Sequence, residues 1–204
     1  IGATQDATIA AERIQAELAV PFELEGRRFF TSASIGIVLN EADYEQPSDI
    51  LRDADIAMYQ AKSLGKARSV VFEASMRQRA VERLNMENEL RLALERHEFA
   101  LHYQPILDLQ AQRISGFEAL LRWRHPERGL VAPGEFIPVA EETGLIVPIG
   151  QGVLREACRQ MAEWHQRFPD EAPLSISVNL SARQFKQTEL AAQVGQILAE
   201  TGLA

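Results

Sequence analysis

The sequence has few of the features that mark a secreted, membrane or nucleic-acid-binding protein. Cys158 is the only cysteine among 204 residues, so no disulfide can form within the chain, which fits a reducing compartment. No apolar run approaches the length of a membrane span, and no secretory signal pattern is present. Lys and Arg number 21 against 29 Asp and Glu, which gives no general basic surface. We expect a cytoplasmic protein that binds no nucleic-acid polymer, and whether the longer protein is tethered to the inner membrane is left open.

The composition is that of an ordinary globular protein, with 46% hydrophobic and 25% charged residues. The chain starts at Ile1 without Met and stops just after a helical stretch. We expect both ends to be cuts in a longer chain. An acidic protein can still bind a small phosphate ligand through a few placed cations or through metal ions.

Residues 1–72 have the pattern of an α+β region. The predicted elements are a helix over 7–18, a hairpin that turns at Gly26 and whose second strand continues to Val38, a helix capped by Ser48 and ended at Gly65, and a strand over 69–72. Residues 73–97 predict a charged helix in which Glu87 and Arg91 form an i,i+4 pair. Its few apolar residues make it poor core material, so we interpret it as a rigid connector between two domains.

From residue 98 onward, strand and helix patterns alternate. Strands are predicted over 101–107, 113–123 and 175–180, and helices over 134–142, 148–168 and 189–200. Strands separated by helices predict a largely parallel sheet or a barrel.

The predicted strands place polar side chains on one face. Side chains alternate along a strand, so Glu118 and Arg122 share a face, while Leu121 lies on the other. Asn179 lies on the polar face of its strand, and Gln104 has the same kind of position in the first. Polar groups on one face of successive strands are typical of an active site at the mouth of a barrel.

The donor types favour one class of metal. Glu118 and Asn179 offer oxygen ligands only, which suit Mg²⁺, Mn²⁺ or Ca²⁺ better than zinc, and the Arg122 guanidinium can hold a phosphate. Ordinary structural roles stay open from the residues alone: Glu118 and Arg122 could form an ion pair, and Asn179 could bond to nearby backbone. Lys62 and Lys66 lie near a helix C-terminus, where cations are favourable whatever their function.

Motifs in the second half of the chain resemble the EAL domain family. The matching segments are YQPI at 103–106, GFEALLRW at 116–123, HP at 125–126, PGEFIP at 133–138, AEETGLI at 140–146 and SVNLSARQF at 177–185. The first half is similar to the second part of a GGDEF domain. The matching segments there are SIGI at 34–37, ADIAMYQAK at 54–62 and GK at 65–66.

The resemblance implies a fold and a domain order. We expect the C-terminal part of a GGDEF domain over 1–72, a connecting helix over 73–97, and the N-terminal part of an EAL domain over 98–204. The fold would be α/β, a partial (β/α) barrel of the TIM type preceded by an α+β cyclase-like part. Because too few barrel strands are present for closure, we expect exposed sheet edges and a chain that is inactive and poorly soluble on its own.

The resemblance also implies an activity and its residues. EAL domains cleave cyclic di-GMP to linear pGpG with two divalent ions, Mg²⁺ or Mn²⁺. Glu118 and Asn179 match metal ligands at the catalytic centre. The positions that match dinucleotide contacts are Gln104, Leu121, Arg122 and Gln184, and Glu141 also lies in a family motif. In the GGDEF part, Lys62 matches a lysine that contacts GTP phosphates, and Lys66 stands where arginine is usual.

Four functions stay open at this point. The leading hypothesis is a cyclic di-GMP phosphodiesterase that pairs through its EAL domain as a homodimer. The second is a catalytically inactive cyclic di-GMP receptor. The third is a diguanylate cyclase that makes cyclic di-GMP from GTP and has a regulatory EAL domain. The fourth is a GGDEF part that binds GTP without cyclising it and acts as an allosteric switch through the connecting helix 73–97. The sequence does not name the input signal or the sensory domain.

Overall fold

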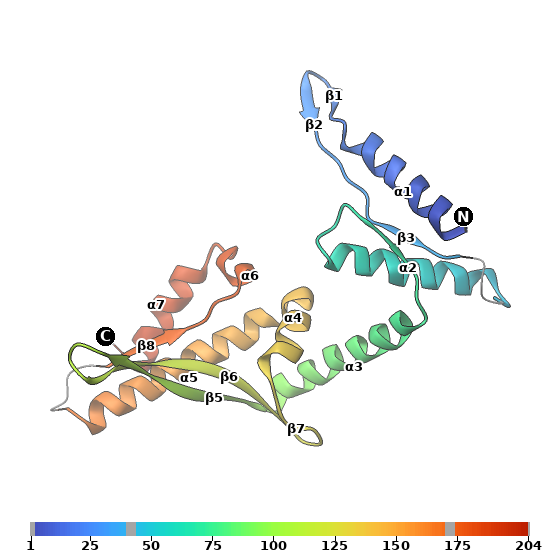
Figure 1. The fold of residues 1–204 in the computed structure, drawn as a ribbon. Helices are drawn as coiled ribbons and strands as arrows, with labels where there is room; N and C mark the ends of the chain where they lie inside the picture. The colour runs from blue at the N-terminus through green and yellow to red at the C-terminus, as the bar shows by residue number, and fades with distance from the viewer. Residues whose placement is uncertain (1–2, 40–43, 170–173, 204) are drawn as a thin grey trace. The chain divides into compact units, whose positions relative to one another are not determined.

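A computed structural model describes residues 3–39, 44–169 and 174–203 (Figure 1). The chain divides into two compact units, Ile1–Arg83 and Leu84–Ala204, and each is described by itself. The predicted boundaries at residues 72 and 97 stay a prediction.

The first unit contains the expected helices and hairpin. Helix α1 (Ala3–Ala19) leads into strands β1 (Phe22–Leu24) and β2 (Arg27–Phe29), which pair antiparallel across a turn where Gly26 has a φ of +75°. Helix α2 (Pro47–Ser63) follows β3 (Ile35–Ile37) along the chain and precedes β4 (Ser69–Val71). Strands β3 and β4 pair parallel in a separate sheet.

Two expectations for the first unit are wrong. The second hairpin strand does not continue to Val38, because the strand ends at Phe29 and β3 joins the sheet of β4. Ser48 is not the N-cap of α2. The helix begins at Pro47 and its N-cap is Gln46, since proline, with a fixed φ and no N–H, suits the first helical position.

A buried carboxylate fixes α2 within this unit. Asp53 is fully buried and accepts hydrogen bonds from Nε of Arg77 at 2.8 Å and from the Tyr44 hydroxyl at 2.9 Å. The hydrogen bonding by the Arg77 guanidinium holds the pKa of Asp53 below its usual value, against the effect of burial. Because Arg77 belongs to helix α3 (Ser75–Glu95), the start of α3 is anchored to α2.

The second unit contains a mixed sheet. Strands β5 (Phe99–Asp108), β6 (Arg113–His125) and β7 (Gly129–Val131) pair antiparallel in that order, and β8 (Ser175–Val178) pairs parallel with β6. The expectation of a largely parallel sheet is therefore wrong for β5 to β7. Their short connections allow only antiparallel pairing, because a parallel crossover needs a dozen residues or more.

Helices cover one face of this sheet. Helices α4 (Pro133–Thr143), α5 (Ile146–Arg167), α6 (Ala182–Phe185) and α7 (Leu190–Thr201) complete the unit. Figure 1 shows α5 running along the sheet, with α7 beside it. Within the described residues the sheet does not close into a barrel, and Ile106, Leu107 and Ile114 are exposed on the β5–β6 hairpin.

The core of the second unit includes part of α3. The buried cluster is Leu90, Ala93, Trp123, Val131, Phe136, Ala140, Leu145, Ile146 and Ile149. The prediction that α3 is poor core material is therefore wrong for its last turns, where Leu90 and Ala93 are fully buried. The expected Glu87–Arg91 pair is confirmed at 2.7 Å.

None of the helices in the described part of the chain is both long and apolar enough to cross a membrane.

Candidate functional site

Glu118 and Asn179 meet at the junction of β6 and β8. The register of this parallel pair places Glu118 opposite Ser177. Asn179 is two residues further along, so it projects from the same face. Its Nδ2 donates a hydrogen bond to Oε1 of Glu118 at 2.7 Å. The structure thus brings together the two residues expected to ligate metal, although that role stays a prediction.

Gln104 lies beside Glu118, in a row of side chains that runs across strands β5, β6 and β8. The antiparallel register pairs Gln104 with Glu118, so Gln104, Glu118 and Ser177 occupy neighbouring positions across three strands. Gln104 is exposed and Glu118 is half-buried. A ligand on this face can therefore reach an amide, a carboxylate and a hydroxyl without any rearrangement of the sheet.

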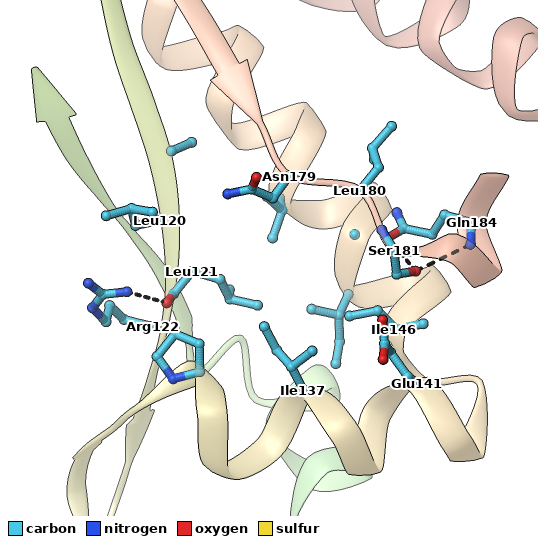
Figure 2. A pocket seen from close by; sticks show the side chains of 15 residues that line it. Leu120, Leu121, Arg122, Ile137, Glu141, Ile146, Asn179, Leu180, Ser181 and Gln184 are labelled. Atoms are coloured by element: carbon cyan, nitrogen blue, oxygen red, sulfur yellow. Dashed lines mark hydrogen bonds between the residues drawn. The ribbon is translucent and has the colours of Figure 1, made fainter. Parts of the chain in front are cut away.

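A cavity of about 230 Å³ lies between β6, the end of β8 and helices α4 and α5. Figure 2 shows Leu121 and Ile137 pointing into it and Glu141 on its α4 side. Its lining is mainly apolar and includes Ile137, Ile146 and Ile149, which the sequence analysis did not assign to the site. Leu121 faces this cavity and not the row of Glu118, as strand alternation requires.

Arg122 turns away from the cavity interior. Its Nη1 donates to the carbonyl oxygen of Leu121 at 2.8 Å (Figure 2). A guanidinium has five N–H donors, so this bond leaves others for an anion.

Gln184 has a structural role in the described fold. It is 4% exposed, and its Oε1 accepts from the backbone N–H and the hydroxyl of Ser181, each at 3.0 Å. The Ser181 hydroxyl in turn accepts from the Gln184 N–H at 3.2 Å. This is a capping box that starts α6, and the Ser-x-x-Gln spacing is the sequence signal that could have predicted it. The expected contact of Gln184 with a dinucleotide stays a prediction.

The two GGDEF-part lysines lie in the first unit. Lys62 is exposed in the last turn of α2, and Lys66 is exposed just beyond that turn with a φ of +63°. Lys66 donates its backbone N–H to the carbonyl of Ala61 at 3.1 Å, which closes the helix end. Their side chains are accessible, and phosphate binding by them stays a prediction.

The donor set at Glu118 and Asn179 fits a hard divalent cation in part. Both side chains carry oxygen ligands, and Mg²⁺ commonly uses one or two carboxylates together with water and substrate phosphate. A half-turn of the Asn179 carboxamide would present Oδ1 where Nδ2 now contacts Glu118. Among the described residues there is no group of three or more His, Cys, Asp or Glu side chains that could hold a metal ion, so this pair would supply only part of a coordination shell.

Comparison with known proteins gives consistent matches. The EAL domain model matches residues 87–204, and the model of the diguanylate cyclase GGDEF domain matches residues 2–68. The chain is 44% identical over 193 residues to the bifunctional diguanylate cyclase/cyclic di-GMP phosphodiesterase MucR of Pseudomonas aeruginosa, covering 95% of this chain and 28% of that protein. It is 40% identical over 190 residues to the cyclic di-GMP phosphodiesterase PdeR of Escherichia coli, covering 93% and 28%.

A solved structure agrees with these relatives. The PaMucR phosphodiesterase in complex with cyclic di-GMP aligns with a TM-score of 0.55 and 48% identity, covering 58% of this chain and 47% of that one. The chain spans about a quarter of the length of the curated relatives it matches.

Proposed function

The chain belongs to the EAL domain family, with a GGDEF segment ahead of the EAL part, and from this premise we propose that the protein acts in cyclic di-GMP signalling by hydrolysing cyclic di-GMP to linear pGpG. The observation that carries the proposal is the contact between Glu118 and Asn179. It supports the proposal because metal-assisted phosphodiester cleavage needs oxygen ligands that converge on one point.

Four side chains would each have a distinct task in hydrolysis. Glu118 and Asn179 would hold Mg²⁺ or Mn²⁺, which supplies an activated water and stabilises charge on the phosphate. The free N–H groups of Arg122 would bind a phosphate oxygen, and Gln104 would orient the dinucleotide from the neighbouring strand.

The test is a hydrolysis assay on the full-length protein with Mg²⁺ or Mn²⁺. We expect linear pGpG to form, and Glu118→Ala to abolish its formation while the variant keeps its fold. Tight binding of cyclic di-GMP by the unmodified protein with no pGpG would contradict the proposal and support a receptor instead.

A second candidate is synthesis of cyclic di-GMP from GTP, with the EAL part regulatory. The GGDEF match over residues 2–68 and the bifunctional name of the MucR relative favour it. Incubation of the full-length protein with GTP and Mg²⁺ tests it: cyclic di-GMP as product supports a cyclase, and unchanged GTP excludes one. The two activities are not exclusive, so each assay needs its own result.

A further inference from the structure

Arg183 belongs to the SVNLSARQF motif but has no task in the proposed chemistry. It is the second residue of α6, four positions after Asn179. Its Nη1 donates to the backbone carbonyl oxygen of Glu141 at 2.6 Å and to that of Glu142 at 3.0 Å. The side chain therefore joins the segment after β8 to the end of α4, across one end of the cavity.

The end of α4 needs a cationic partner from outside the helix. The last carbonyl groups of a helix have no partner within it, and α4 has no basic residue in its last turn. Instead the sequence places Glu141 and Glu142 there, and negative charge is unfavourable at a helix C-terminus. Arg183 donates to two of these carbonyl groups and brings a positive charge to this end of the helix.

The turn after α4 is shaped around this guanidinium. Gly144 has a φ of +86°, and a Cβ on it would lie 3.0 Å from Nη2 of Arg183. Within α5 itself, a Cβ on Gly150 would lie 2.1 Å from Nε2 of Gln184. Adjacent residues of α6 thus contact the turn after α4 and the start of α5.

We infer that Arg183 is a positioning residue that fixes the segment carrying Asn179 against the helix carrying Glu141, and so sets the geometry in which Asn179 meets a divalent cation. The inference rests on the proposed function, because the cation at Glu118 and Asn179 is part of it. Loss of a residue that orients a metal ligand typically costs 10–100-fold in metal affinity. Arg183 is itself exposed and acts through the backbone, so the expected loss is about 10-fold.

The experiment is a Mn²⁺ titration of the full-length protein with two readouts. One is the rate of cyclic di-GMP hydrolysis, and the other is the Mn²⁺-dependent rise in unfolding temperature without substrate. Arg183→Met should require about 10-fold more Mn²⁺ in both readouts. Arg183→Lys should show a smaller shift in the same direction, since an ammonium can donate to the same carbonyls without the planar fork.

Arg155→Met is the matched control. Arg155 is an exposed helical arginine whose Nε lies 3.3 Å from Oε2 of Glu200, joining α5 to α7 away from the cavity. This variant should keep the parent Mn²⁺ midpoint, while the metal-free unfolding temperature of each variant measures any general loss of stability.

The outcomes separate the two proposals. The role of Arg183 is overturned if Arg183→Met has the same Mn²⁺ midpoint as the unmodified protein, or if Arg155→Met shifts that midpoint equally. Should Arg183→Met fail to fold, Arg183→Lys decides: a raised midpoint supports the role and a parent midpoint overturns it. If Mn²⁺ stabilises the unmodified protein but no hydrolysis occurs, only the phosphodiesterase proposal is refuted. The role of Arg183 is then still tested, because the Mn²⁺-dependent unfolding temperatures of the variants can be compared. No Mn²⁺ response at all refutes both.

Discussion

Helix α3 contributes to the core of the second unit through Leu90, and truncation of this side chain measures that contribution. Leu90 is 0% exposed and packs in the cluster with Trp123 and Phe136. Leu90→Ala removes three carbon groups, and at ~0.8 kcal/mol for each buried methylene the transfer cost alone is about 2.4 kcal/mol. The cavity that remains raises the total, so we expect a loss of about 3–4 kcal/mol in the free energy of unfolding.

Urea unfolding of the chain, followed by tryptophan fluorescence, checks this value. The two tryptophans, Trp123 and Trp164, both belong to the second unit, so the signal reports on that unit. Leu84→Ala is the matched control, because Leu84 lies on the same helix but is 59% exposed, and we expect a change within about 0.5 kcal/mol. Equal effects of the two truncations would refute the packing of α3 into this core.

Two further perturbations test other parts of the fold. Asp53→Asn should lower the unfolding temperature at neutral pH, because the carboxylate that accepts from Arg77 is lost. The folded-state pKa of Asp53 is lowered, so its contribution is present above the unfolded pKa of roughly 4 and is lost as pH falls through the lower folded value. The difference in unfolding temperature between variant and parent should therefore shrink in acid. Thermal unfolding at a series of pH values checks this, and a difference that stays constant with pH would show that the ion pair is unimportant. Gly150→Ala should cost about 1–3 kcal/mol, because its Cβ meets Gln184, whereas Gly152→Ala on the same helix has open space and should stabilise by up to about 1 kcal/mol. Chemical denaturation compares the two, and a stabilising Gly150→Ala would contradict the packing of α6 on α5.

Periodicity predicted the elements of the second unit well. The strand predicted over 113–123 is β6, Arg113–His125, and the helix predicted over 148–168 is α5, Ile146–Arg167. These elements are long, so the alternation or the helical repeat recurs several times. Strand β7 and helix α6 were missed because three or four residues contain too little of any period.

Strand direction could have been predicted from the connection. Between β5 and β6 the chain has only residues 109–112, too few for a crossover to a parallel neighbour. The core role of α3 was harder to predict. Leu90 and Ala93 are one turn apart among charged residues, and only the packing of the second unit shows that this side of the helix is covered.

Alternation along single strands placed Glu118 and Arg122 on one face and Leu121 on the other. It could not give the register between strands, and that register is what puts Gln104 and Ser177 beside Glu118. The task of Arg183 depends on contacts with the distant end of α4, which no local pattern specifies, whereas the capping role of Gln184 follows from the Ser-x-x-Gln spacing.

The position of Mn²⁺, located by anomalous scattering in crystals of the full-length protein, tests the proposed metal site most directly. We expect a Mn²⁺ ion bonded to a carboxylate oxygen of Glu118 and to Oδ1 of Asn179, with the carboxamide turned from its present hydrogen bond. Mn²⁺ bound elsewhere, with Nδ2 of Asn179 still donating to Glu118, would contradict it.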